Sequence, residues 1–91
     1  MYEVKTSTKF DKDFNRVEKR GYDMTLLQDV ITILQNCNAL EKRHKDHPLI
    51  GNYIGYRECH IKPDWLLVYK IDTEHDTLEL TRTGTHSDLF D

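Results

Sequence analysis

Three runs rich in β-branched and aromatic residues constrain the fold of this chain most strongly. They span residues 53–61, 65–71 and 77–83, and only residues 62–64 and 72–76 separate them. Connections this short join antiparallel neighbours, because a connection between parallel strands needs a crossover of a dozen or more residues. The second half of the chain is therefore predicted to form a meander of three antiparallel strands.

Two amphipathic helices are predicted before these strands. Thr8 resembles an N-cap residue, and the apolar residues that follow recur at i, i+4 and i+7 from Phe10. Gly21 is expected to end this helix, since glycine readily adopts the left-handed conformation found after helices. Asp23 is then expected to cap a second helix, whose apolar stripe lies within residues 26–34.

The remaining segments complete an α+β arrangement. Residues 2–7 read as a first short strand, residues 41–51 as a loop, and residues 86–90 as at most one helical turn. The predicted order is β-α-α-β-β-β, with two N-terminal helices packed on one face of an antiparallel sheet. At 91 residues the chain is expected to form a single domain over residues 1–91.

Composition excludes several classes of protein. A charged fraction of 32% and a hydrophobic fraction of 37% are typical of a globular domain. The apolar runs are far shorter than the roughly 20 residues that cross a bilayer, and the start of the chain does not resemble an export signal. We expect a cytoplasmic protein without a membrane partner, in which Cys37 and Cys59 are reduced, buried thiols.

Charge is distributed unevenly along the chain. The net charge is −3, but residues 1–40 are neutral, residues 41–70 carry +2 and residues 71–91 carry −5. The basic middle segment also contains His44, His47 and His60, which add positive charge when protonated. An RNA-binding surface is therefore expected around this segment.

Strand periodicity groups several ionisable side chains. Glu58 and His60 share one face of their strand, while Cys59 faces the other way, because side chains alternate along a strand. Asp64 follows in the next turn, and His47 lies in the loop before the strand. On spacing alone these groups form a candidate site on the open face of the sheet, although surface histidines are often only surface histidines.

Several ordered motifs resemble a known family. They are Lys45-Asp-His-Pro-Leu49, Gly55-Tyr-Arg57 running into His60, Pro63-Asp-Trp65 with Val68-Tyr-Lys70, and Arg82-Thr-Gly-Thr-His86 with Leu89-Phe90. Together they are similar to the YafQ branch of the RelE superfamily of bacterial toxin–antitoxin toxins, over nearly the entire chain. The fold of that superfamily is the arrangement predicted above.

The resemblance implies an activity and its partners. Such a toxin is an endoribonuclease, an mRNA interferase that cuts translated messenger RNA on the ribosome and is held inactive by a cognate ribbon-helix-helix antitoxin. Operator DNA is implied as a partner only through the antitoxin complex, and no cofactor is implied.

By position, the resemblance also implies site residues. Catalytic roles fall on His47, His60, Asp64 and His86, and RNA-binding roles fall on Lys45, Glu58, Arg82 and Phe90. Metal-free RNA cleavage needs a base for the 2′-hydroxyl and an acid for the leaving 5′-oxygen, and histidine suits both roles. We expect His86 as the acid, His60 or Asp64 as the base, and His47 at the phosphate, with acid and base open to exchange.

Other readings of the same residues stay open. Arg82 suits a structural salt bridge about as well, and Phe90 also suits an apolar plug that closes the core. The basic residues of the first helix suit either ribosomal RNA or plain solvation: Lys9, Lys12, Arg16, Lys19 and Arg20.

Two other classes of function compete with the nuclease. One is a zinc site built from His44, His47, Cys59 and His60, which lacks the usual paired motifs. The other is a non-catalytic RNA- or protein-binding module of the same fold, against which the histidine set argues.

Overall fold

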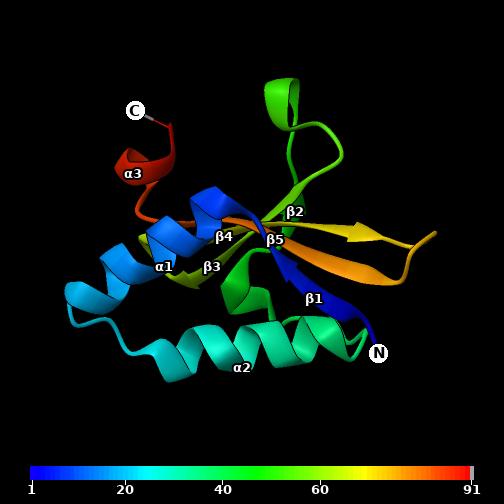
Figure 1. Ribbon diagram of the computed structural model, residues 1–91, viewed down its shortest axis with the longest axis horizontal. Helices are drawn as coiled ribbons and strands as arrows, with labels where there is room; N and C mark the ends of the chain where they lie inside the picture. The colour runs from blue at the N-terminus through cyan, green and yellow to red at the C-terminus, as the bar shows by residue number, and fades with distance from the viewer. Residues whose placement is uncertain (91) are drawn as a thin grey trace.

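One five-stranded sheet organises the chain, in the order β1-β5-β4-β3-β2 (Figure 1). The computed structural model describes residues 1–90. Its elements are β1 (Glu3–Thr6), α1 (Thr8–Lys19), α2 (Met24–Gln35), β2 (His47–Pro48), β3 (Arg57–Lys62), β4 (Trp65–Asp72), β5 (Thr77–Gly84) and α3 (His86–Phe90), with single 3-10 turns at Lys42–His44 and Gly51–Tyr53.

The predicted meander of β3, β4 and β5 is antiparallel, as expected, and the α+β class is confirmed. The sheet is nevertheless mixed, because β1 runs parallel to β5 along its outer edge. The backbone N–H groups of Glu3 and Ser7 donate to the carbonyls of Asp76 and Leu80, just beyond the ends of this ladder. The strand predicted over residues 53–61 is shorter than expected and begins only at Arg57.

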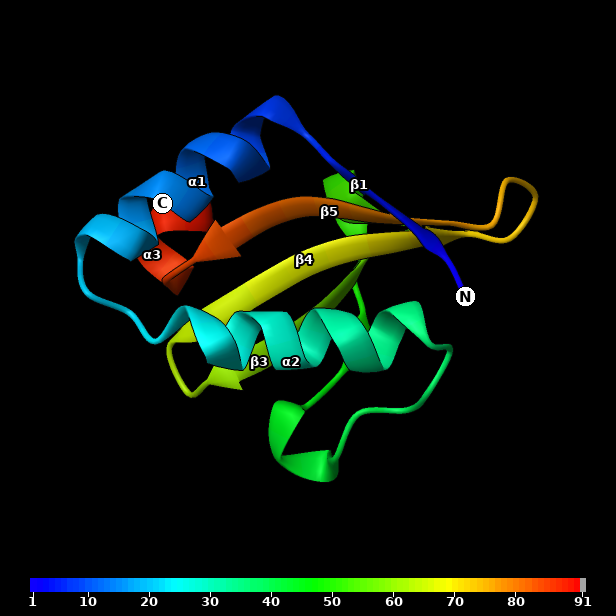
Figure 2. The ribbon, with the colours of Figure 1, turned by 60° about the horizontal axis from the view of Figure 1, so that its bottom comes forward.

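Both long helices cover one face of the sheet. Figure 2 shows α2 lying across β3 and β4, with α1 alongside the far end of β5. The predicted cap at Asp23 is confirmed, since its carboxylate accepts from the backbone N of Thr25. The cap predicted at Thr8 is wrong by one residue: Ser7 Oγ accepts from the backbone N of Phe10 and donates to the carbonyl of Thr81, which ties the start of α1 to β5.

The central strand β4 is buried on both faces. Trp65, Leu67 and Tyr69 belong to the main core beneath α1 and α2. Leu66 and Val68 face the other side, where they form a smaller cluster with Leu89 of α3. The side of the sheet away from the helices is therefore partly covered, whereas the sequence predicted an open face.

The segment between β2 and β3 completes that second cluster. Leu49, Tyr53 and Tyr56 pack against it, while Ile50 and Ile54 are exposed at the tip of a loop that extends away from the sheet (Figure 1). Among residues 1–90, no helix is both long enough and apolar enough to span a bilayer.

The two cysteines differ in environment. Both are free, and Cys59 is buried, as expected, whereas Cys37 is exposed, so the expectation of burial is wrong for Cys37. Burial raises the pKa of the Cys59 thiol far above its usual range, which keeps it protonated and unreactive.

A buried ion pair holds α1 against β5. The carboxylate of Asp13, 2% exposed, accepts from Arg82 Nε at 2.7 Å, from Arg82 Nη2 at 3.2 Å and from the backbone N of Thr83 at 3.1 Å. The bond from the backbone N of Thr83 gives the edge of β5 a partner beyond the point where its pairing with β1 ends. Replacement of Asp13 would remove the ion-pair partner of Arg82, leaving the guanidinium a bond from Nη2 to the carbonyl of Asp88 at 3.5 Å, and would remove the carboxylate that accepts from the backbone N of Thr83.

Asp13→Ala is expected to lower the free energy of unfolding by about 3 kcal/mol, because it removes the carboxylate that pairs with the largely buried guanidinium of Arg82. Urea denaturation followed by circular dichroism measures this loss. Asp11→Ala, in the exposed first turn of the same helix, is the matched control and should cost about 0.5 kcal/mol. A loss below about 1 kcal/mol for Asp13→Ala would contradict the role assigned to the pair.

Candidate active site

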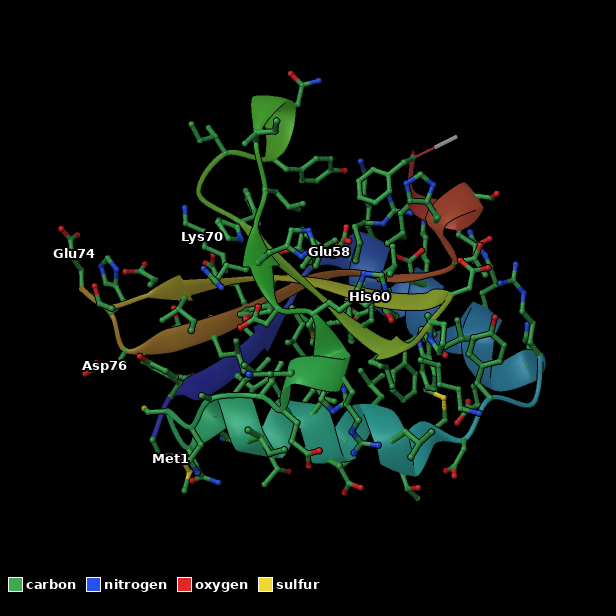
Figure 3. The ribbon with its side chains drawn as sticks, turned by 180° about the vertical axis from the view of Figure 1, so that it is seen from behind. Met1, Glu58, His60, Lys70, Glu74 and Asp76 are labelled. Carbon is green, nitrogen blue, oxygen red and sulfur yellow. The ribbon has the colours of Figure 1, made fainter. Side chains whose placement is uncertain are left out.

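The carboxylate of Glu58 lies between two imidazoles. Its Oε1 atom is 3.7 Å from His47 Nε2 and 3.6 Å from His60 Nε2, and the ring centroids of the two histidines are 6.4 Å apart. Figure 3 shows the Glu58 and His60 side chains together, well away from the β4–β5 turn that carries Glu74 and Asp76. The strand periodicity that grouped these side chains is thus realised in space.

Backbone carbonyls orient both rings. His47 Nδ1 lies 2.6 Å from the carbonyl of Lys45, and His60 Nδ1 lies 3.1 Å from the carbonyl of Pro63. Carbonyl oxygens only accept, so each Nδ1 carries the hydrogen and each Nε2 is left facing Glu58. The Nε2 contacts with the carboxylate become attractive when a proton resides on one of the three groups. The two imidazoles therefore present their Nε2 atoms to one shared carboxylate oxygen.

The short strand β2 places His47 opposite Glu58. In the β2–β3 ladder these two residues are direct partners, so their side chains share one face of the sheet. Asp46 anchors the preceding segment, since its Oδ1 accepts from Tyr69 Oη at 2.6 Å and from Arg57 Nε at 3.3 Å. The loop predicted over residues 41–51 is thereby fixed to the sheet.

Asp64 and His86 meet at the end of the sheet. The backbone N of His86 donates to Asp64 Oδ1 at 3.2 Å, joining the β3–β4 turn to the start of α3. Both side chains are exposed. Asp64 thus contacts the backbone of His86, and the carboxylate between the imidazoles of His47 and His60 is that of Glu58.

An aromatic group lies next to His86. The ring centroid of Phe90 is 5.1 Å from that of His86 and 5.8 Å from that of Tyr53. Phe90 is 37% exposed, while its neighbour Leu89 is 8% exposed and fills the second cluster. Leu89 therefore acts as the apolar plug, and the exposed face of Phe90 is free to stack on a base.

Arg16 of α1 and Arg20, the residue that follows the end of α1, hold α3 in place. Arg20 Nη1 and Nη2 donate to the two oxygens of Asp88 at 2.6 and 2.9 Å, and Arg16 Nη1 lies 3.8 Å from Asp88. A five-residue helix has little stability by itself, so α3 depends on such contacts. Two of the five basic residues predicted either to dock on ribosomal RNA or to be solvated therefore pair with Asp88. No local sequence pattern indicates this pair, because Arg20 and Asp88 lie 68 positions apart in the chain.

The other predicted residues occupy different surroundings. Arg82 is paired with Asp13 and only 15% of its side chain is exposed, which favours the structural alternative for this residue. Lys45 is exposed, and its backbone carbonyl is the one that lies 2.6 Å from His47 Nδ1. The proposed zinc set is not brought together: Cys59 belongs to the main core, and His44 Nδ1 lies 2.7 Å from the carbonyl of His60.

A second group of metal-ligand side chains lies elsewhere. Within residues 1–90, Asp72, Glu74 and His75 have ligand atoms within 4.8 Å of one another, in the exposed β4–β5 turn. His75 Nδ1 already lies 2.8 Å from Asp72 Oδ2, and that contact lowers the pKa of Asp72. This turn is at a distance from the histidine site (Figure 3).

Asp88→Asn is expected to loosen α3, so that the backbone amide of Leu89 exchanges with solvent several-fold faster at neutral pH. Arg20 and the amide of Thr85 hold the pKa of Asp88 well below its usual range. The stabilisation is therefore present above about pH 4 and is lost as the pH falls, and the Asn variant should lack this dependence. Amide hydrogen exchange measures both effects.

The control for this experiment is Glu18→Gln, which removes the same charge from an exposed position of α1. It should leave the exchange rate of Leu89 unchanged. Equal exchange rates in the Asp88→Asn variant and the unaltered protein would contradict the role of the Arg20–Asp88 ion pair in holding α3.

Comparisons with known proteins agree with this geometry. Residues 2–91 match the family model described as the bacterial toxin of a type II toxin–antitoxin system, YafQ. The mRNA interferase toxin YafQ of Escherichia coli is 40% identical over 89 residues, which cover 97% of this chain and 95% of that protein.

Solved structures match equally closely. The metal-bound toxin from Helicobacter pylori superposes with a TM-score of 0.94 at 48% identity, covering 99% of this chain and all of that one. YafQ in the E. coli DinJ–YafQ complex superposes with a TM-score of 0.90 at 39% identity, with both chains fully covered. The chain therefore belongs to the YafQ family of toxins of type II toxin–antitoxin systems.

Proposed function

We propose that this protein is an mRNA interferase, an endoribonuclease that cleaves messenger RNA without a metal ion and is neutralised by a cognate antitoxin. The observation that carries the proposal is the group formed by His47, Glu58 and His60, which lies at the same end of the fold as Asp64 and His86. The family to which the chain belongs supports the toxin role, and the DinJ–YafQ complex supports a protein antitoxin as partner.

Cleavage follows from proton transfer at this site. A base, His60 or Asp64, takes the proton of a 2′-hydroxyl, and the 2′-oxygen attacks the adjacent phosphorus. The bond from phosphorus to the 5′-oxygen breaks, and His86 gives its proton to that oxygen. His47 binds the phosphate, and Glu58 supports the charge of either neighbouring imidazole. Phe90 stacks on a base beside the cut.

The ribosome supplies the RNA in a reactive conformation. A net charge of −3 gives little general attraction for RNA, since phosphate neutralisation dominates such affinity. The surplus of +2 in residues 41–70 holds a few phosphates near the histidines, and the remaining acidic surface disfavours unrestrained RNA. A ribosome that presents and bends the message overcomes this deficit.

Metal binding at the same residues is a second candidate. Two imidazole Nε2 atoms on either side of a carboxylate are ligands that suit transition metals, and a similar H. pylori toxin was crystallised with bound metal. A metal ion there would occupy the nitrogen atoms that proton transfer needs. It would therefore inhibit cleavage.

His60→Ala, His86→Ala and Asp64→Ala are each expected to lower cleavage at least about 100-fold and to abolish growth arrest, because each removes a proton-transfer group. All three should keep a native circular dichroism spectrum, since none belongs to the main core. His75→Ala, in the exposed β4–β5 turn, is the control and should remain toxic. The site assignment fails if any two of the three folded variants still arrest growth.

Cleavage products report the chemistry directly. Attack by the 2′-oxygen leaves a 2′,3′-cyclic phosphate and a 5′-hydroxyl, and a substrate with deoxyribose at the cut should resist the enzyme. EDTA, at levels that leave ribosomes intact, should not reduce the rate, while excess copper(II) should reduce it. Efficient cutting of the deoxy substrate, or activity lost to EDTA, would replace the histidine mechanism by a metal-dependent one.

Dependence on the ribosome is tested by comparing two forms of one message. Purified protein should cut it far faster in a translating extract than after removal of protein, at equal salt and RNA concentration. We expect this difference because a net charge of −3 gives the protein little general attraction for RNA. Comparable cleavage rates in the two conditions would contradict the proposed role of the ribosome.

A further inference from the structure

His44 is a buried histidine to which the proposed cleavage mechanism gives no role. Its side chain lies in the single 3-10 turn Lys42–His44, between α2 and β3 (Figure 3). The residue is only 6% exposed, whereas its neighbours Arg43 and Lys45 are exposed. Burial of an imidazole is costly unless a hydrogen bond compensates for the lost contact with water. The position of this ring therefore depends on the partner that it finds inside the protein.

That partner is the backbone of His60. His44 Nδ1 lies 2.7 Å from the carbonyl oxygen of His60, and Nδ1 donates this bond because a carbonyl oxygen only accepts. The strand β2 pairs only with Arg57 and Glu58 of β3, so within residues 1–90 no strand lies against the outer edge of β3 at His60. The imidazole of His44 thus supports that edge at the residue that carries a proton-transfer group of the candidate site.

The bond from His44 is made where β3 is irregular. The register between β3 and β4 shifts between His60 and Lys62, and such an irregularity changes the direction of the side chains next to it. The His60 ring is held separately, since its Nδ1 lies 3.1 Å from the carbonyl of Pro63. His44 therefore holds the backbone from which the His60 ring projects, while Pro63 holds the ring itself.

The segment that begins at His44 also carries the second histidine of the site. Lys45 has a φ of 46°, a left-handed conformation that ends the 3-10 turn, and its carbonyl lies 2.6 Å from His47 Nδ1. His47 is the direct ladder partner of Glu58. Residues 44–47 thus contact the backbone of His60 at one end and place an imidazole opposite Glu58 at the other.

We propose that His44 is a positioning residue for cleavage, whose bond to the His60 carbonyl sets the separation of the His47 and His60 rings on either side of Glu58. The inference rests on the proposed function, which makes His60 a proton-transfer group. Without this bond the end of β3 can move relative to residues 44–47, and the distance of 6.4 Å between the ring centroids is no longer fixed. A displacement of about 1 Å can slow a positioned reaction by up to about 100-fold.

Two substitutions separate the hydrogen bond from the bulk of the ring. His44→Leu keeps a large side chain but has no donor, whereas His44→Asn is smaller and keeps an amide N–H donor. On ribosomes that carry a message, His44→Leu should lower kcat about tenfold and leave KM within about twofold, because it displaces a proton-transfer group and removes no contact with RNA. His44→Asn should restore kcat to within about threefold of the unaltered protein. Lys42→Ala, exposed in the same turn, is the control and should leave kcat unchanged.

A purely structural role for His44 gives a different result. Folded His44→Leu protein would then unfold at a lower temperature but keep the kcat of the unaltered protein, and this outcome would overturn the proposal. The proposal is also overturned if His44→Asn is as slow as His44→Leu, because the donor would then be irrelevant to the rate.

Ring signals in nuclear magnetic resonance spectra test the geometry without any cleavage. The His47 and His60 ring signals should both shift in His44→Leu, whereas the His75 signals, from the distant β4–β5 turn, should stay in place. Unchanged His47 and His60 signals in this variant would contradict the role of His44. Failure of the unaltered protein to cleave any message would instead count against the proposed function, and the ring signals would then decide whether His44 positions the two imidazoles.

Discussion

The burial of β4 on both faces is the constraint on which the rest of the structure depends. Its odd-numbered residues from Trp65 to Tyr69 pack under α1 and α2, and its even-numbered residues Leu66 and Val68 require a cover on the opposite side. The chain provides that cover from two distant segments, the loop over residues 49–56 and the helix α3. Hydrophobic burial on the second face therefore brings the candidate site together, because the same segments carry or adjoin His47, His86 and Phe90.

Ion pairs then set the positions of α1 and α3, which apolar packing alone leaves undetermined. Asp13 joins α1 to β5 through Arg82, and Asp88 joins α3 to α1 through Arg20. The two carboxylates are linked by Arg16, which lies within 4 Å of both. The five-residue helix α3 is thus held by an ion-pair network at its base, which leaves the side chains of His86 and Phe90 exposed.

The His60 ring and the start of α3 share one structural support. The β3–β4 turn orients the His60 ring through a backbone carbonyl and receives the start of α3 through Asp64. One short turn therefore sets the relative positions of a proposed base and a proposed acid. Such a shared support suits a small toxin whose net negative charge gives it little affinity for RNA from general electrostatics.

Local pattern in the sequence was enough to predict the elements and part of the site. Helical spacing in residues 8–34, the cap at Asp23 and the short connections between strands predicted both helices and the meander, because these signals act between near neighbours. Alternation along β3 placed Glu58 and His60 on one face, spacing along the chain added His47 and Asp64, and the resemblance to a toxin family added His86.

Only the tertiary structure decided how these residues meet. The parallel pairing of β1 with β5, the pairing of His47 with Glu58 across β2 and β3, and the contact of Arg20 with Asp88 all join residues distant in the chain, and no local pattern encodes them. The tertiary structure also assigned Arg82 to Asp13 and made Leu89, in place of Phe90, the plug of the second cluster. The physical reason is that such contacts follow from burying both faces of β4, a condition satisfied by the whole chain and not by any one segment.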